Sequence, residues 1–449
     1  MSKIKSFFKS FCNHVKYYYK QLDLHFKYAI NRYLLVIISV LITGLSLYAR
    51  FSVSLYPTND VEGIIFSWIR NIQEVGFKKF YTIDADYSYF LLFIYAIISI
   101  MPVSSTVTVG SQTFVASWMY MIKGINFVND ILLAVGVGLI IYHITKNKLK
   151  GFIGYWIVMC LPVQLFDSAI WGNCDSLYVM LFAYTILLIL KKKDGFAWLL
   201  FGFTLGTKLQ SVFILPLLVF LTLSNKMKFY KSVLIIPGLF ITFLPTWICG
   251  CSFTLPFKYF TTELERFPSL TLGCANFWHL VGVNDHYLDI VNKGSTVIGL
   301  LLIGIFMAVL FVRKIKLDDS ALMKLSIFLI SIVPFFLPHM HERYFFALDV
   351  FVVIYALIDK KRFNYILILL MQVSSGIAYY HYLNGYYFIH SMGEDSVHIA
   401  SFINLFVLSY IFIDLLKCEQ GKSHLEEADD IEKELISLEE NHKAEVLEK

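Results

Sequence analysis

Long apolar runs, separated by short polar segments that carry lysine or arginine, recur along most of this chain. Runs of roughly 17 to 25 residues match the length that an α-helix needs to cross a hydrocarbon core of about 30 Å. The pattern therefore predicts an all-α polytopic membrane protein with about twelve transmembrane helices. The predicted spans are about 33–51, 126–144, 151–168, 174–190, 195–206, 209–223, 231–248, 293–312, 321–337, 344–358, 363–383 and 399–416.

Composition supports a membrane rather than a soluble protein. The chain is 57% hydrophobic and only 16% charged, whereas an ordinary soluble domain has about 25% charged residues and can cover itself with a polar surface. The net charge of +5 does not indicate nucleic-acid binding, because most basic residues fall in N-terminal and inter-helix segments, where the positive-inside rule accounts for them.

The positions of the basic residues predict the topology. Residues 1–32 read as a basic amphipathic segment on the cytoplasmic membrane surface. Residues 33–416 form the predicted transmembrane domain, and residues 417–449 form a charged cytoplasmic tail. Because the basic loops alternate with weakly charged ones, both termini are expected in the cytoplasm. A large first loop, about 52–125, is expected outside, where its apolar parts can also dip into the membrane.

Under this topology, several acidic residues lie at the extracytoplasmic side. Asp60 and Glu62 follow the first span, and a carboxylate there can act as a general base; a solvated loop acid or a helix N-cap is the structural alternative. Asp86 and Tyr87 begin an apolar segment and suit either acceptor binding or interfacial anchoring.

Two further external turns carry polar groups. Asn173 and Asp175 lie in a tight turn between two spans, and a turn favours such residues in any case. Lys208 and Gln210 interrupt an apolar stretch at the outer end of two short predicted spans. A lysine on the outer side opposes the positive-inside bias and calls for an anion, which a phosphate would supply; snorkelling of its side chain is the alternative.

A dense polar motif and a late loop complete the external candidates. His341, Glu342 and Arg343 precede a predicted span, and an arginine fork and a histidine suit phosphate binding. The histidines lack the HExxH spacing of zinc enzymes, so no metal is expected. Asn276 and Trp278 lie in the late loop and suit sugar binding, although aromatic residues are common at interfaces.

In this order along the chain, these motifs resemble those of the GT-C glycosyltransferases, in particular the bacterial proteins related to the GPI-anchor mannosyltransferases. Asn59-Asp60-Val61-Glu62 is similar to the acidic segment after the family's first span, and Asp86-Tyr87-Ser88-Tyr89 to an Asp-Tyr-x-Pro segment whose proline is missing here. The remaining matches are Ser168 through Ser176, Thr207 through Gln210, Asn276–Trp278 and Met340–Tyr344.

The resemblance implies a membrane glycosyltransferase that moves a hexose from a polyprenyl-phosphate-sugar donor, such as undecaprenyl-phosphate-hexose, to a glycan or lipid-linked glycan with inversion. Asp60 would be the catalytic base, and Lys208, His341 and Arg343 would bind the donor phosphate. The other candidates would bind the acceptor or sugar: Glu62, Asp86, Tyr87, Asn173, Asp175, Gln210, Asn276, Trp278 and Glu342. Neither a cofactor nor a metal is expected.

Two rival functions remain at this point. A transporter or flippase of lipid-linked saccharide would also use basic and aromatic groups, but would be expected to place them near the bilayer midplane. A ligase that joins whole polysaccharides to an acceptor would use similar chemistry.

Overall fold

The structure is a computed structural model that describes residues 33–103, 105–109, 112–265, 269–281, 289–359, 361–383 and 389–418. The predicted basic segment 1–32, and all but the first two residues of the predicted tail 417–449, lie outside these described residues. The described chain is mostly helical. After the first helix, Tyr33–Val53, the elements in chain order are η1 (Asn59–Ile65), α2 (Phe66–Val75), η2 (Phe77–Thr82), α3 (Tyr89–Ser99), β1 (Thr106–Val109), β2 (Gln112–Val115), α4 (Ala116–Thr145), α5 (Lys148–Met159), α6 (Pro162–Leu165), η3 (Phe166–Trp171), α7 (Asp175–Leu190), α8 (Asp194–Thr207), η4 (Leu209–Ile214), α9 (Leu215–Leu223), η5 (Phe229–Leu234), α10 (Ile235–Ile248), α11 (Leu255–Glu265), β3 (Thr271–Leu272), α12 (Phe277–Leu280), α13 (Asp289–Val312), α14 (Asp319–Phe336), β4 (Met340–His341), α15 (Phe346–Ile358), α16 (Asn364–Leu383) and α17 (Ile389–Leu416).

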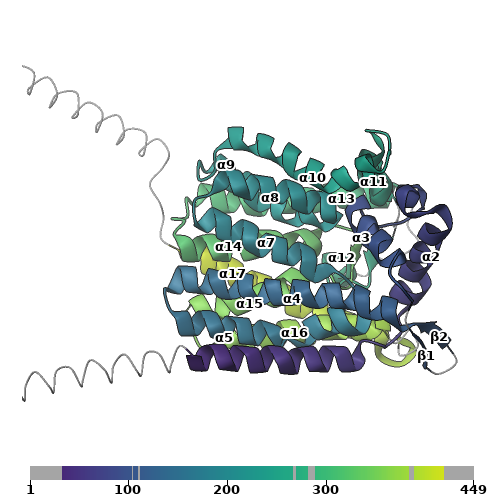
Figure 1. Ribbon diagram of the computed structural model, residues 1–449. Coiled ribbons are helices and arrows are strands. Elements are labelled where there is room, and N and C mark those ends of the chain that lie inside the picture. Colours follow the sequence, from purple (N-terminus) through teal and green to yellow (C-terminus); the bar gives the residue numbers. More distant parts are fainter. Residues whose placement is uncertain are drawn as a thin grey trace, which may run out of the picture.

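Most long helices run side by side, with the smaller elements α2, α3, α12, β1 and β2 gathered at one end of the bundle (Figure 1). Among the described residues, six helices are long and apolar enough to cross a membrane. They are Tyr33–Val53, Ala116–Thr145, Phe229–Ile248, Gly294–Val312, Asp319–Phe336 and Ser396–Leu416. The chain is therefore a helical membrane protein, and the sequence-based prediction of many spans holds at this coarser level.

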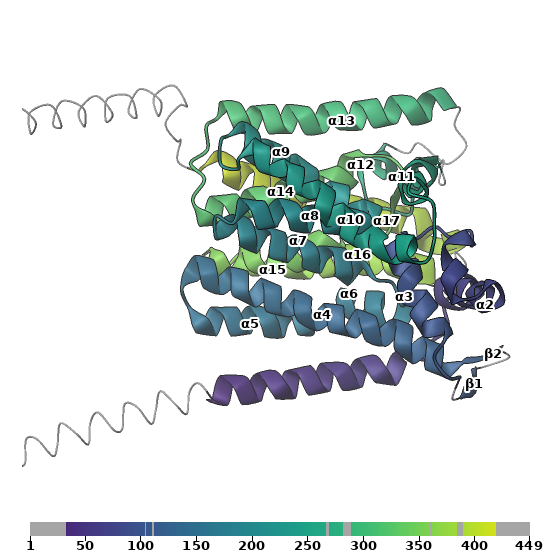
Figure 2. The ribbon, with the colours of Figure 1, turned by 45° about the horizontal axis from the view of Figure 1, so that its top comes forward.

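Burial separates central helices from peripheral ones. In α14, 89% of the most apolar 18-residue stretch is buried inside the protein. The buried share of the corresponding stretch is only 11% in the first helix and 22% in α13. The first helix and α13 lie on opposite flanks of the bundle (Figure 2). Helices that expose most of an apolar surface need an apolar solvent, so these two flanks are suited to face lipid.

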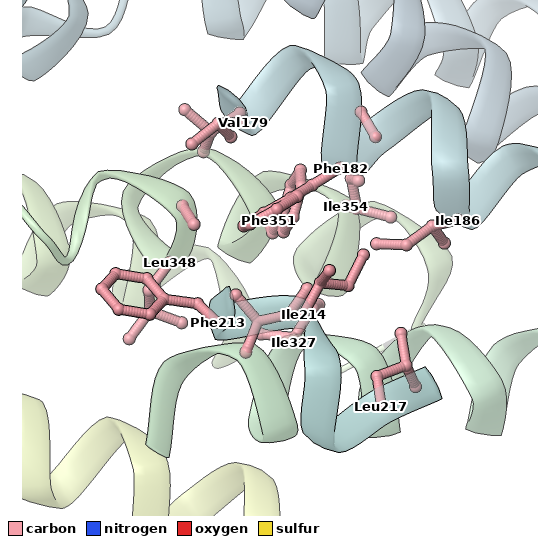
Figure 3. Close-up of a cluster of buried hydrophobic side chains, with 14 of the residues drawn as sticks. Val179, Phe182, Ile186, Phe213, Ile214, Leu217, Ile327, Leu348, Phe351 and Ile354 are labelled. Atoms are coloured by element: carbon pink, nitrogen blue, oxygen red, sulfur yellow. The ribbon is translucent and has the colours of Figure 1, made fainter. Parts of the chain in front are cut away.

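The core lies where α7, α9, α14 and α15 meet. Phe182, Phe351 and Ile327 come from three of these helices and point toward one another beside Phe213 of η4 (Figure 3). Each of these side chains is at most 2% exposed. This packing fixes the helices whose ends carry the polar residues discussed below.

Glycine permits a close contact between α8 and α10. A Cβ atom on Gly202 of α8 would collide with the Ile235 carbonyl oxygen of α10, and one on Gly238 of α10 would collide with the Leu199 carbonyl oxygen of α8. Small residues at helix contacts let backbones approach in membranes, where the hydrophobic effect does little to join helices.

Several helices differ from the predicted spans, and α17 begins at Ile389 rather than near residue 399. Helix α4 begins at Ala116 rather than near residue 126, so part of the predicted first loop is helical. The predicted span at about 151–168 is broken: α5 and the segment Pro162–Trp171 meet at an angle of 49°. The break falls just before Pro162, whose ring and missing N–H favour the start of a helix over its interior.

Candidate functional site

Two aromatic side chains hold the Asp60 carboxylate in place. The Trp171 indole Nε1 donates to Asp60 Oδ2 at 2.8 Å, and the Tyr382 hydroxyl donates to Asp60 Oδ1 at 2.5 Å. The two rings also stack, with centroids 4.3 Å apart and planes 15° from parallel. Asp60 is thus fixed by η1, η3 and the last turn of α16, three segments far apart in sequence.

A buried ion-pair cluster lies at the ends of α7, α8 and α15. Asp175, the first residue of α7, pairs with Lys208, and its Oδ2 lies 3.2 Å from Arg343 Nε. Arg343 Nη1 also donates to Glu342 Oε1 at 3.0 Å. Asp175 is fully buried and the other three are at most 9% exposed. Two cations and two carboxylates therefore balance one another in this cluster.

The same contacts keep these groups charged. Burial alone would lower the pKa of Lys208, but the neighbouring Asp175 carboxylate outweighs burial and raises that pKa above its ordinary value. Burial would raise the pKa of Glu342, but the hydrogen bond and charge of His341 and the charge of Arg343 lower it below its ordinary value. These directions favour the charged forms of Lys208 and Glu342.

Trp171 joins Asp60 to this cluster. Its Nε1 bonds Asp60, and its ring lies 5.4 Å from the Arg343 guanidinium carbon, within cation–π range. The predicted base and one predicted phosphate ligand therefore contact the same indole.

Several predicted sugar-binding residues border the cluster. The Tyr87 hydroxyl donates to Asn173 Oδ1 at 3.2 Å, and the Tyr87 ring lies 5.6 Å from Lys208 Nζ. Gln210 Nε2 donates to the Tyr344 hydroxyl at 2.5 Å. Side chains from the first loop, the 172–175 turn and the segment after α8 therefore meet here.

Other predicted residues lie at the margin of the site. His341 Nδ1 is 3.8 Å from Glu342 Oε2, and its side chain is 16% exposed. Glu62 lies in η1 two residues after Asp60, and Asp86 directly precedes Tyr87; both are half-buried. Their positions are compatible with ligand binding, which stays a prediction for all three.

Asn276 and Trp278 make structural contacts instead. Asn276 Nδ2 donates to the Pro334 and Leu337 carbonyl oxygens at 3.4 Å, and Trp278 Nε1 donates to the Phe336 oxygen at 2.7 Å. Both residues thereby hold α12 against the end of α14, just before the His341–Arg343 motif. Their role in acceptor or sugar binding stays a prediction, and in the structure these polar groups serve packing.

Sequence reasoning missed three residues that shape the site. Trp171 falls inside the Ser168–Ser176 match but is not among the predicted site residues, and Tyr382 gives no signal in the sequence. Asp167 is fully buried, and its backbone oxygen accepts from the Gly172 and Asn173 N–H groups at 2.9 and 3.0 Å. These bonds form the turn that presents Asn173. The match over Ser168–Ser176 is the sequence signal that points to this turn and to Trp171.

The described residues contain no group of three or more His, Cys, Asp or Glu side chains that could hold a metal ion.

Comparison with known proteins does not assign this chain to a family. No protein-family model matches the chain, and no curated protein matches it.

Proposed function

We propose that the chain is an inverting membrane glycosyltransferase that transfers a hexose from a polyprenyl-phosphate-sugar to a glycan or lipid-linked glycan. The observation that carries this proposal is the contact of Asp60 and Arg343 with the same Trp171 indole. A general base and a cationic cluster within reach of one substrate are what this reaction needs.

In the proposed reaction, the acceptor hydroxyl gives its proton to the Asp60 carboxylate while its oxygen attacks the anomeric carbon. The bond between that carbon and the phosphate oxygen breaks, and the electron pair leaves with the polyprenyl phosphate. The phosphate gains negative charge in this step, which Lys208, Arg343 and His341 would stabilise.

The cations can serve the phosphate without losing Asp175. An ammonium group has three N–H donors and a guanidinium five, whereas the pairs with Asp175 and Glu342 engage only some of them. Asp175 would then hold both cations in place before the donor arrives. Tyr87, Asn173 and Gln210 would contact the sugar or acceptor.

We place the site on the extracytoplasmic side, in a bundle of about twelve spans with both termini in the cytoplasm. Three shorter apolar helices coincide with predicted spans and support a count above six: Asp175–Leu190, Leu209–Leu223 and Phe346–Ile358. The segment between the first helix and α4 forms the proposed large external loop. Its elements α2 and α3 lie at the end of the bundle that carries the site (Figure 1).

The test is transfer by purified protein in lipid nanodiscs, with a panel of undecaprenyl-phosphate sugars and candidate acceptor glycans. We expect one donor to yield glycosylated acceptor and free undecaprenyl phosphate, detected by mass spectrometry. A Lys208→Met variant should lose transfer, whereas Lys226→Met, at an exposed lysine, should retain it. Transfer from no donor, or movement of intact lipid-linked saccharide across the bilayer without release, would contradict the proposal.

A further inference from the structure

A buried lysine outside the ion-pair cluster has an unusual environment. Lys123 of α4 is fully buried, and its Nζ donates to the backbone oxygens of Tyr56 and Ile170, each at 2.9 Å. Within the described part of the chain, no carboxylate forms an ion pair with it. Burying an amine in this way is costly compared with an apolar side chain.

The two carbonyl groups belong to the segments that carry the site. Tyr56 lies four residues before Asp60, and Ile170 directly precedes Trp171. A single amine therefore joins the segment of the proposed base to the segment of the indole that binds it. Because Lys123 is on the long helix α4, both segments are fixed to a rigid element.

Neighbouring contacts reinforce the same connection. The Thr58 hydroxyl donates to the Trp171 oxygen at 2.7 Å, and Asn126, three residues after Lys123 on α4, donates to the Gly172 oxygen at 3.0 Å. Gly172 has a φ of +89°, and a Cβ there would press on Lys123 Cε at 3.1 Å. These residues, Tyr56, Thr58, Lys123, Asn126 and Ile170–Gly172, are called the Lys123 junction below.

We propose that Lys123 is a positioning residue that sets the place of Asp60 relative to Trp171 and the cation cluster. This inference rests on the proposed function, because positioning Asp60 matters only if Asp60 is the base in the transfer step. Lys123 itself touches no reacting atom. It acts through the backbone of the two segments, and misplacing a reacting group by about 1 Å can cost about 100-fold in rate.

The kinetic test compares Lys123→Met with Lys150→Met. Lys150 is a matched control, because its Nζ donates to the backbone oxygen of Leu357 at 2.7 Å, away from the site. Lys123→Met should lower kcat roughly 10- to 100-fold and leave the donor KM unchanged, since Lys208 and Arg343 are intact. Lys150→Met should keep both values. A normal kcat for Lys123→Met, or a rise in donor KM, would overturn the inference.

A double-variant test identifies the residue through which Lys123 acts. In an Asp60→Asn background, Lys123→Met should cause no further loss of residual rate. An equal further loss would mean that Lys123 acts by some other route. If Lys123→Met does not fold, Thr58→Val removes another bond of the junction with little change in shape, and should lower kcat in the same way; normal kcat in that variant would contradict the inference.

A structural measurement separates this inference from the proposed function. Spin labels at exposed positions 59 and 166, in protein with its native cysteines replaced, report the distance between η1 and η3. Lys123→Met should broaden or shift the distance distribution and Lys150→Met should not. An unchanged distribution would refute the positioning role, whereas absence of transfer by the unaltered protein would refute only the proposed function.

Discussion

Asp175→Asn is the sharpest test of the ion-pair cluster, because it removes one charge and almost no volume. Asp175 is fully buried and is the shared partner of Lys208 and Arg343. For the 3.2 Å contact with Arg343, Coulomb's law with an effective dielectric constant of about 20 gives roughly 5 kcal/mol. Loss of one partner of a buried pair typically costs about 3–5 kcal/mol, so we expect a loss in that range.

The assay is reversible unfolding in mixed micelles, with the free energy of unfolding measured for each variant. Asp194→Asn is the control, because the Asp194 contact with Lys231 is longer, at 3.7 Å, and the lysine side chain is 30% exposed. Such a pair contributes about 0–1 kcal/mol. In an Arg343→Gln background, Asp175→Asn should cost less than it does alone. A loss below about 1 kcal/mol for Asp175→Asn would refute the reasoning.

Three further predictions follow from other contacts. Tyr382→Phe keeps the ring but removes the hydroxyl that donates to Asp60, so steady-state kinetics should show a kcat lower by about 10-fold or more with an unchanged donor KM; a changed KM alone would assign Tyr382 to substrate binding. Gly238→Leu should abolish the yield of monodisperse protein in size-exclusion chromatography, because its side chain would collide with the α8 backbone. Gly44→Leu should behave normally, because a Cβ atom at Gly44 would have no neighbouring atom within 4 Å. The pKa of Glu342 is lowered, so its contribution to stability is complete above the ordinary carboxyl pKa and is lost as pH falls through the folded-state value; thermal unfolding of Glu342→Gln should depend less on acid pH than unfolding of the unaltered protein, and equal dependence would exclude this contribution.

The bounds of two long spans were predictable from the sequence to within about two residues. The first helix, predicted at about 33–51, is Tyr33–Val53, and α14, predicted at about 321–337, is Asp319–Phe336. Such spans are recognisable because a helix of that length satisfies its own backbone hydrogen bonds in lipid.

The start of α4 was not predictable in the same way. Lys123 and several polar residues interrupt the apolar pattern between 116 and 126, so the segment reads as loop. In the structure, backbone oxygens of two other segments accept from the Lys123 amine. A single sequence shows the polar group but not the distant partner that permits its burial.

The site residues were predictable in kind but not in their pairing. The sequence motifs placed Asp60, Lys208 and Arg343 among the candidates. They did not show that Asp175 is the counter-ion of both cations, or that Tyr382, 322 residues after Asp60, donates to its carboxylate. Contacts over such separations depend on helix packing, which hydropathy does not encode.

The same limit appears at the opposite end of α15 and α17. Lys361 reads as an ordinary cytoplasmic loop lysine. In the structure its amine pairs with Asp414 and lies 3.7 Å from Asp359, and Lys324 contacts the same two carboxylates at 2.6 and 3.1 Å. Charge bias predicts the side of the membrane but not these partners.

The most direct test of the central claim is the rate at which Asp60→Asn releases undecaprenyl phosphate from bound donor in the presence of acceptor. Glu74→Gln, at an exposed acid on α2, is the matched control. We expect Asp60→Asn to bind donor normally and to react at least about 100-fold more slowly, with the control unchanged. A folded Asp60→Asn protein that releases undecaprenyl phosphate at the unaltered rate would contradict the account.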